Sequence, residues 1–462
     1  MFTPDVYIQR RNTLRQRLSK GVALLIGHNE APINFAHNTY PFRQDATFSY
    51  FFGLNQPGLI GLIELDNAQE TLFVEDSTDP DAIIWHAQHA SPAQMATASG
   101  CDTVKRRHLL QAAINKVLRS GRPLHFLPPY RSDTALTLSQ MIQWLPKDLG
   151  RLASRSLTRE VVAMREVKEP RERAQIESAL RVTDEMHRLA MRMTRAGMVE
   201  SEIVAHMRQV LGREGLQEAY SPIFTRHGEI LHNLEHGNHL LKGDLVINDA
   251  GACSPLGYAS DVTRTLPVGG RFEPHQRELY ELLLDVQEHA IQQARSHVRF
   301  LDVHLAAAHR LADGMKALGF FTGNTADIVE SGAYALCFPH GLGHLLGLDV
   351  HDMESLGENW VGYDHSVSRS EQFGLCNLRL GKPLKRGMVL TVEPGIYFIP
   401  ALIKRWQAER RHTGLINYER FIAYENFGAM RIEDVVLVDD SSGQVLGPTI
   451  PKHPDDVENC MA

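Results

Sequence analysis

Two aspartates in the second half of the chain are spaced so that they could meet across a hairpin. Asp249 ends the run Asp-Leu-Val-Ile-Asn-Asp, Asp261 begins Asp-Val-Thr-Arg-Thr-Leu, and turn-forming residues separate the runs. A hairpin centred near Pro255 would place the aspartates opposite each other, with Cβ atoms about 5 Å apart. Carboxylates that close repel each other unless a cation or a proton lies between them. The pair indicates a cation site, with two solvated hairpin aspartates as the alternative.

Three histidines lie further along, in a stretch rich in glycine and aliphatic residues. His340, His344 and His351 fall within Pro-His-Gly-Leu-Gly-His-Leu-Leu-Gly-Leu-Asp-Val-His-Asp. Glycines let the backbone approach a ligand closely, and apolar surroundings favour the neutral imidazole that binds metals. The glycine spacing does not fit a dinucleotide-binding loop, and a histidine occupies its middle. The stretch therefore predicts metal binding, with histidines packed in an ordinary loop as the alternative.

Two glutamates lie among residues that favour β-strands. Glu393 follows Met-Val-Leu-Thr-Val and precedes Pro-Gly-Ile-Tyr, and Glu433 lies in Met-Arg-Ile-Glu-Asp-Val-Val-Leu-Val. A carboxylate is costly to bury without a partner, so each glutamate either meets a cation or lies at an edge. Arg431, two residues before Glu433, shares its strand face. An ion pair between Arg431 and Glu433 is the alternative to a metal.

One further histidine pattern resembles a zinc site without satisfying its requirements. His232-Asn-Leu-Glu235-His236 matches the H-x-x-E-H motif of some zinc peptidases. That motif needs a helix that places both histidines on one face. Gly228 and Gly237 bracket the segment and Asn233 lies inside it, and both residue types form helices poorly. The sequence therefore argues against this motif.

The elements expected around these residues are strands and helices in mixed order. In the first third, helical patterns and short apolar runs alternate: helices at 4–19, 108–119 and 134–145, apolar runs at 21–26, 47–54, 59–65 and 71–74, and a strand at 123–127. The last two runs flank a plausible hairpin turn at 66–69. The polar stretch 146–157 is the expected boundary between a domain at 1–157 and a domain at 158–462.

The second domain is expected to place its carboxylates on or beside strands. Four helices are predicted there, at 169–196, 200–214, 274–295 and 301–318. The predicted strands are 222–226, 229–234, 244–250, 258–266, 387–393, 395–399 and 430–438. The long helix begins at Glu169-Pro170, because proline suits a first turn. The polar tail 451–462 is expected to be loosely held. The fold class is α/β, of the α+β kind.

Composition excludes several classes of function. The 462 residues carry Lys+Arg 48 and Asp+Glu 55, a net charge of −7, which argues against nucleic acid or an anionic membrane as a partner. No apolar run approaches the roughly 20 residues that span a bilayer. The first residues show no signal-peptide pattern. The five cysteines lack Cys-x-x-Cys spacing, which fits a reducing, cytoplasmic location and argues against a cysteine zinc site.

Five blocks in this order resemble the pita-bread metallopeptidases, and most closely prolidase and aminopeptidase P. They are Asp249-Ala-Gly, Ser260-Asp-Val-Thr-Arg-Thr, His340-Gly-Leu-Gly-His344, Val392-Glu-Pro-Gly-Ile-Tyr397 and Arg431-Ile-Glu433-Asp. The likeness is strong over 158–450. The first 157 residues resemble the family's smaller N-terminal domain more weakly. The resemblance implies a small N-terminal α/β domain followed by a pita-bread catalytic domain.

The resemblance also implies a centre with two divalent metal ions. By position in the blocks, its ligands would be Asp249, Asp261, His344, Glu393 and Glu433. One imidazole and four carboxylates form an oxygen-rich site, which favours Mn²⁺, with Co²⁺ or Zn²⁺ also possible. In such centres a bridging water becomes hydroxide near neutral pH and attacks the scissile carbonyl. Glu393 would accept its proton and pass it to the leaving nitrogen.

Further roles follow from the resemblance alone. His340 and His351 would line the pocket and stabilise the tetrahedral intermediate or position the substrate, and His232 matches another pocket histidine. Arg431 and Tyr397 match residues beside the metals. Close relatives usually carry tyrosine after the histidine that matches His232, where this chain has Asn233. That departure removes a phenol from the pocket and leaves the ligand set complete.

The implied reaction is hydrolysis of the bond before proline. That bond is a tertiary amide without an N–H, so peptidases that grip the backbone N–H cannot hold it. Arg379, fourteen residues before Glu393, matches an arginine with which prolidases bind the carboxylate of a dipeptide through two hydrogen bonds. The segment 397–427 also looks more like prolidase. A solvated loop arginine is the alternative.

The expectation is a manganese-dependent Xaa-Pro dipeptidase that acts on small peptides and forms a homodimer. Aminopeptidase P, which accepts longer peptides, is the alternative enzyme. A metal-free member of the fold, either creatinase-like or a protein-binding module, is the alternative of another class. Such relatives typically lose ligands, whereas all five matching residues are present here.

Overall fold

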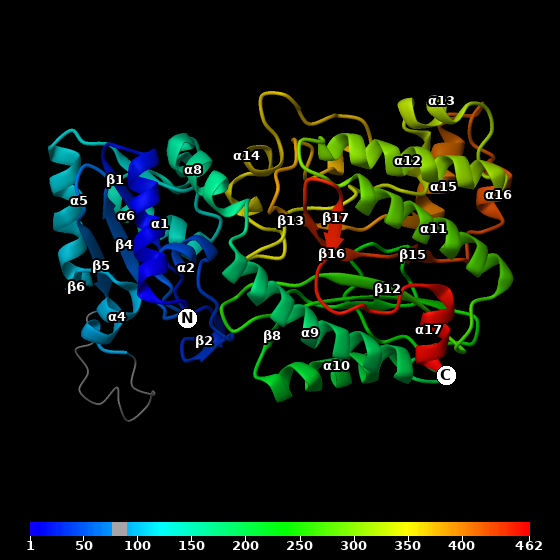
Figure 1. Ribbon diagram of the computed structural model, residues 1–462, viewed down its shortest axis with the longest axis horizontal. Helices are drawn as coiled ribbons and strands as arrows, with labels where there is room; N and C mark the ends of the chain where they lie inside the picture. Colours follow the sequence, from blue (N-terminus) through cyan, green and yellow to red (C-terminus); the bar gives the residue numbers. More distant parts are fainter. Residues whose placement is uncertain (76–89) are drawn as a thin grey trace. The chain divides into compact units, whose positions relative to one another are not determined.

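The computed structural model describes residues 1–75 and 90–462, and its contacts divide the chain into two compact units (Figure 1). Unit 1 comprises Met1–Arg165 with Met353–Val361, and unit 2 comprises Glu166–Asp352 with Gly362–Ala462. Both units combine helices with sheets, so the expected α/β class is confirmed. The division into domains at 157 and 158 stays a prediction.

Unit 1 is built on a five-stranded mixed sheet. The strand order is β6-β5-β4-β1-β7, in which β1 is antiparallel to β4 and parallel to β7. The strands are β1 (Val22–Ile26), β4 (Ile60–Glu64), β5 (Glu70–Val74), β6 (Thr103–Arg106) and β7 (Leu124–Phe126). A separate short hairpin joins β2 (Pro32–Phe35) to β3 (Asn38–Thr39). The predicted hairpin at 66–69 is confirmed by the antiparallel pairing of β4 with β5.

Several helices of unit 1 contribute apolar side chains to a core over this sheet. The helices in its described residues are α1 (Pro4–Arg17), α2 (Ala46–Phe52), α4 (Pro92–Ser99), α5 (Leu110–Arg119), α6 (Ser132–Ile142), α7 (Leu149–Leu152) and α8 (Arg155–Arg165). One core cluster joins β1, β4 and β7 to α5 and α6, with Leu24, Ile114 and Leu138 fully buried. Helical turns also occupy most of the polar stretch 146–157.

The apolar run 47–54 lies largely in a helix. Asp45 caps α2 by accepting a hydrogen bond from the backbone N–H of Phe48 at 2.8 Å. Gly53 ends the helix with φ 68°, a conformation that glycine adopts without strain. Six of its seven residues are buried, which removes the alternation of exposed and buried positions by which a helix is recognised in sequence.

Unit 2 places its strands between two pairs of long helices. Figure 1 shows α9 beside α10 on one side of the strands and α11 beside α12 on the other. The four helices are α9 (Pro170–Met193), α10 (Glu200–Glu214), α11 (Pro274–Gln293) and α12 (Phe300–Ala317). All four were predicted. In α9, Pro170 occupies the first turn, and the Glu172 side chain accepts a hydrogen bond from the N–H of Glu169.

The strands of unit 2 form several small sheets. Their members are β8 (Gln217–Glu218), β9 (Ile223–Thr225), β10 (Leu245–Ala250), β11 (Ala252–Cys253), β12 (Val262–Pro267), β13 (Val389–Val392), β14 (Gly395–Tyr397), β15 (Ala429–Arg431), β16 (Asp434–Val438) and β17 (Gly443–Val445). The order in the two larger sheets is β12-β10-β9 and β13-β16-β17. Shorter helices complete the unit: α13 (Thr325–Glu330), α15 (Pro400–Ala408), α16 (Tyr418–Ile422) and α17 (Pro454–Met461). The short helix α14 (Glu358–Gly362) belongs to unit 1 except for Gly362.

Three expectations for unit 2 are wrong. The segment 229–234 forms turns and no strand, because Asn233 bonds to Thr225 Oγ1 at 3.1 Å and turns the chain. The run 430–438 breaks at 432–433, which separates β15 from β16. The tail is not loosely held: it forms α17, which buries Val457 and Met461 at helical spacing.

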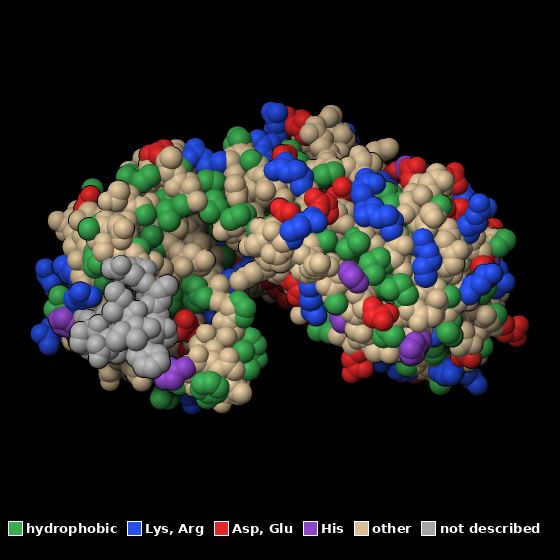
Figure 2. Space-filling model, turned by 90° about the horizontal axis from the view of Figure 1, so that it is seen from below, with side chains coloured by type: hydrophobic (Ala, Val, Ile, Leu, Met, Phe, Trp, Pro, Cys, Tyr) green, Lys and Arg blue, Asp and Glu red, His purple; other side chains and the backbone are tan. Residues whose placement is uncertain are grey.

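The surface of unit 2 carries mixed charge. Figure 2 shows Lys and Arg side chains interspersed with Asp and Glu over the face of unit 2 that it presents. Among residues 1–75 and 90–462, no helix is long and apolar enough to cross a membrane.

Candidate metal centre

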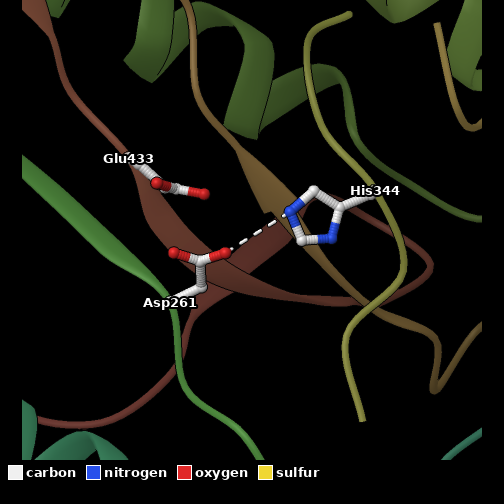
Figure 3. Close-up of side chains that lie close together, drawn as sticks. All are labelled: Asp261, His344 and Glu433. Atoms are coloured by element: carbon white, nitrogen blue, oxygen red, sulfur yellow. Dashed lines mark ion pairs between the residues drawn. The ribbon is translucent and has the colours of Figure 1, made fainter. Parts of the chain in front are cut away.

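Three predicted ligands come together in unit 2, and all three are buried (Figure 3). Asp261, His344 and Glu433 each offer a ligand atom, and these atoms lie within 4.8 Å of one another. Asp261 immediately precedes β12, and Glu433 occupies the break between β15 and β16. The break that ends one strand thus turns the Glu433 carboxylate toward the centre.

His344 is held with one ring nitrogen available to the centre. Its Nδ1 lies 3.1 Å from the carbonyl of Leu345, which only an N–H can satisfy, so in the neutral ring Nε2 carries the lone pair. That Nε2 lies 3.4 Å from Asp261 Oδ2 and 3.6 Å from Glu393 Oε1. A Cβ on Gly343 would stand 1.9 Å from the carbonyl of Thr391, so the loop needs glycine to approach β13.

Asp249 joins the centre through a register that differs from the predicted one. In the β10–β12 pair, Asp249 is opposite Thr263, so Asp261 lies two residues away along β12. Diagonal neighbours on one face still lie within reach of each other's side chains. The turn is centred one residue later than predicted, because Cys253 pairs with Ala259.

Tyr220 bridges the two aspartates, and the sequence reasoning missed it. Its hydroxyl lies 2.5 Å from Asp249 Oδ1 and also contacts Asp261 Oδ1. A phenol has one proton, so it can donate to only one of these oxygens at a time. Burial, with Asp249 and Asp261 adding to it, raises the pKa of Tyr220 well above its ordinary value. No spacing in the sequence links Tyr220 to either aspartate.

The carboxylates of the centre are buried and repel one another. Burial, and after it the charge of Asp249, raises the pKa of Asp261 well above its ordinary range. Burial and then Asp261 do the same for Glu433, which also accepts a hydrogen bond from Thr263 Oγ1 at 2.7 Å. Burial and the charge of Glu433 raise the pKa of Glu393 to about 8. The chain alone does not balance this negative charge.

Arg431 is the guanidinium that contacts the centre. It pairs with Asp249 Oδ2, and it donates to Tyr397 Oη at 2.8 Å and to Thr263 Oγ1 at 3.1 Å. Arg431 therefore does not pair directly with Glu433. Thr263 Oγ1 lies between the two side chains, accepting from Arg431 and donating to Glu433. Arg431 links Tyr397 to the carboxylates, as expected for residues beside a metal.

His340 has both ring nitrogens engaged. Nδ1 lies 2.8 Å from the carbonyl of Gly341, and Nε2 lies 3.0 Å from Tyr397 Oη. Nδ1 is therefore the donor, and Nε2 accepts from the tyrosine. Burial, and then Arg431, lowers the pKa of His340 to about 3, so its ring is neutral. In this arrangement His340 acts through Tyr397.

The remaining predicted residues are His351, His232 and Arg379. The ring of His351 stacks on that of His344, with centroids 3.8 Å apart. His232 is exposed on a turn, and partial desolvation of its ring, followed by the charges of Arg431 and Arg379, lowers its pKa. Arg379 is half-buried. The segment 232–236 contains no helix, as the argument against its zinc motif expected.

The chemistry of these residues fits divalent metal ions. Four carboxylates and one imidazole nitrogen are the donors that hard cations such as Mn²⁺ prefer. Asp249 and Asp261 share a tyrosine hydroxyl that cannot satisfy both, and the negative charge exceeds that of the contacting guanidinium. Dications would relieve the repulsion that raises the carboxyl pKa values. This donor set could therefore hold divalent metal ions, and the assignment of the five ligands stays a prediction.

Two known family models match this chain. The family model for "Metallopeptidase family M24" matches residues 174–440, and the model for "Aminopeptidase P, N-terminal domain" matches residues 7–125. A "Probable Xaa-Pro aminopeptidase" of Fusarium vanettenii is 30% identical over 97% of this chain and 93% of its own length. The human Xaa-Pro dipeptidase is 27% identical, with 99% of this chain and 93% of its own length covered.

A solved structure shares the whole architecture. Zinc-substituted Escherichia coli aminopeptidase P in complex with product superimposes with a TM-score of 0.81 at 26% identity, covering 100% of this chain and 98% of that one. The expected fold, a smaller N-terminal domain with a pita-bread domain, is confirmed. The chain belongs to metallopeptidase family M24.

Proposed function

We propose that this protein is a metal-dependent Xaa-Pro dipeptidase, which hydrolyses the bond before a C-terminal proline. The observation that carries the proposal is the buried group of Asp261, His344 and Glu433, with Asp249 and Glu393 beside it. Relatives named Xaa-Pro dipeptidase and Xaa-Pro aminopeptidase, which this chain matches over nearly its full length, support the bond specificity.

Two divalent ions, preferably Mn²⁺, would be held by the five ligands Asp249, Asp261, His344, Glu393 and Glu433. When bound, such ions lower the pKa of a water and polarise a carbonyl. His344 presents the unprotonated Nε2 that this requires, because Leu345 fixes the tautomer. Tyr220 and Arg431 hold Asp249 from opposite oxygens and so orient it.

Glu393 is the proposed proton carrier. Its carboxylate would take a proton from the attacking water and later return it to the leaving nitrogen, as a general base that then acts as a general acid does. Its side chain is 18% exposed, so it can reach substrate, and Thr391 donates to its Oε1 at 3.2 Å. His232 and His351 line the pocket, and His340 holds Tyr397.

Arg379 is the proposed contact for the substrate carboxylate. Its charge helps to lower the pKa of His232, another predicted pocket residue, which supports this role. A guanidinium binds a carboxylate through two parallel hydrogen bonds. A peptide that continues beyond proline has no carboxylate at this place, so Arg379 would select dipeptides.

Aminopeptidase P is the second candidate, favoured by the likeness to the Escherichia coli structure. The deciding experiment compares an Xaa-Pro dipeptide with the matching Xaa-Pro-Xaa tripeptide, with Mn²⁺ and with Arg379→Ala alongside. A dipeptidase cleaves the dipeptide much faster, and Arg379→Ala raises its KM. Equal rates on both peptides, with KM unchanged in the variant, would instead support aminopeptidase P.

The metal-free alternative predicts a different result. A binding module or creatinase-like protein would purify with little metal and stay inactive on both peptides after Mn²⁺ is added.

We further propose that the active form is a cytoplasmic homodimer in which residues 1–157 and 158–462 form the two domains. Sedimentation would measure the subunit number.

A further inference from the structure

A buried ion pair lies three residues from Arg379. Lys382 Nζ stands 2.6 Å from Glu166 Oε2, and their side chains are 7% and 3% exposed. The other oxygen of Glu166 pairs with Lys385 Nζ at 2.5 Å, but the side chain of Lys385 is 58% exposed. Glu166 thus has two ammonium partners, one inside the unit and one at its surface.

The backbone on both sides of Arg379 is fixed. On one side, Tyr363 Oη donates to the carbonyl of Leu378 at 2.6 Å. On the other, the carbonyl of Gly362 accepts from the N–H groups of Gly381 and Lys382 at 2.8 and 2.9 Å. The segment 378–382 is therefore held at its ends, and the Lys382 side chain anchors its last residue.

The same segment packs against the pocket. Asn377 Nδ2 donates to the carbonyl of Pro339 at 3.0 Å, and a Cβ on Gly341 would stand 2.8 Å from Leu378 Cα. Residues 339–341 carry His340, which bonds to Tyr397 beside the centre. A shift of segment 378–382 would therefore move Arg379 relative to the pocket histidines.

Stability alone is a weak reason for this ion pair. Taking an ammonium and a carboxylate out of water costs free energy that their attraction often fails to repay, and apolar residues of similar size are frequently as stable. Burial lowers the pKa of Lys382, although Glu166 acts in the opposite direction. In some proteins a buried ion pair instead fixes one specific arrangement, and here the contact of Lys382 with Glu166 fixes the end of segment 378–382.

We propose that Lys382 is a positioning residue, whose ion pair with Glu166 holds segment 378–382 so that Arg379 meets the carboxylate of the substrate. The inference rests on the proposed function. It predicts that disturbing the pair harms the recognition of a free carboxylate and spares the chemistry at the metal centre.

The test uses the full-length Mn²⁺-loaded protein and two substrates, an Xaa-Pro dipeptide and the same dipeptide with a C-terminal amide. Lys382→Met should raise KM for the free dipeptide about 10- to 100-fold, since misplacing a binding group by about 1 Å costs up to that much. The kcat of this variant for the free dipeptide should stay within about twofold of the value for the unsubstituted protein. Its kcat and KM for the amide should do the same. Lys382→Arg should restore most of the lost affinity.

Lys385→Met is the matched control, because it removes the surface partner of the same carboxylate. It should leave both substrates unaffected. A cycle with Arg379→Ala adds a second readout: Lys382→Met should cause no further loss once Arg379 is absent, because both act on one contact. If Lys382→Met does not fold, the isosteric Glu166→Gln takes its place in every arm.

Two kinds of failure are distinguishable. The inference is overturned if Lys382→Met raises KM equally for the free and the amidated dipeptide. It is also overturned if the effects of Lys382→Met and Arg379→Ala on KM add in the cycle. Either result would leave the ion pair a structural role only. If the unsubstituted protein cleaves neither substrate, or if Arg379→Ala changes neither KM, the proposed function itself fails and the inference falls with it.

Discussion

Glu433 and Asp434 are neighbours in the chain, yet they lie in two buried clusters that differ in charge balance. Glu433 faces the metal centre, where burial and the other carboxylates raise its pKa. Asp434 faces a cluster of Arg264, Lys452 and Gln287, and its oxygens accept from these side chains at 2.7, 3.0 and 2.9 Å. Burial alone would raise the pKa of Asp434, but Arg264 and Lys452 lower it well below its ordinary value.

The difference separates a structural cluster from a functional one. Around Asp434 the chain supplies its own cations, and Arg264 also donates to the backbone carbonyls of Glu433 and Pro451. This balanced cluster therefore fixes the backbone at Glu433 and the start of β16. Around Glu433 the carboxylates outnumber the contacting guanidinium, which leaves negative charge for a metal to neutralise. Both clusters are buried, so uncompensated negative charge, more than burial, distinguishes the functional site from the structural cluster.

Removing a carboxylate from the unbalanced cluster should have the largest effect on activity. Glu433→Gln deletes a proposed ligand, so kcat should fall by well over the roughly 100-fold that loss of an outer partner costs. The metal-free variant should nevertheless melt higher at pH 8 than the unsubstituted protein, because one repelling charge is gone. Metal analysis, peptide hydrolysis and thermal unfolding measure these effects. Retained activity would contradict the ligand assignment.

Removing the carboxylate from the balanced cluster should harm stability instead. Asp434→Asn leaves Arg264 buried beside a neutral amide, and breaking a buried pair costs about 3–5 kcal/mol of unfolding free energy. Urea unfolding measures the loss. Asp455→Asn is the control, since Asp455 also lies 2.7 Å from an arginine, Arg277, but is 76% exposed. Comparable losses in both variants would remove the distinction between the clusters.

Metal binding should stabilise the protein more at pH 8 than at pH 5. The pKa of Glu393 rises from 4.5 to about 8 on folding, so the metal-free protein is stabilised below pH 4.5 and loses that contribution as pH rises toward 8. Metal ions bind the deprotonated carboxylates, and their positive charge offsets the repulsion among them. The difference in Tm between loaded and metal-free protein should therefore grow over this range. An unchanged difference would mean that no ligand releases a proton.

The smallest expected effect is at Tyr220. Tyr220→Phe keeps the ring and removes the hydroxyl shared by Asp249 and Asp261. Loss of such an outer partner should weaken metal affinity about tenfold, at the low end for these contacts. Titration with Mn²⁺ measures it, and His206→Phe on the exposed side of α10 serves as a surface control. Unchanged affinity would show that Arg431 alone orients Asp249.

Residues that lie in continuous strands or amphipathic helices were predictable from sequence. The four long helices of unit 2 and strand β10 follow from periodicity, and the candidate ligands follow from carboxylates among apolar residues. Register was not predictable, because the β-bridge of Cys253 with Ala259 moves the turn by one residue and pairs Asp249 with Thr263. Tyr220 was missed because its contacts join segments 29 and 41 residues apart without a periodic signal.

The most direct test of the metal-centre proposal is chelation followed by metal readdition. The protein is stripped with a chelator, assayed on an Xaa-Pro dipeptide and its matching tripeptide, and assayed again as Mn²⁺ is added. We predict that hydrolysis of the dipeptide disappears on chelation and returns as about two ions bind per chain, the number that a two-metal centre requires. Undiminished hydrolysis after chelation, or less than about one ion per chain with no activity on readdition, would contradict it.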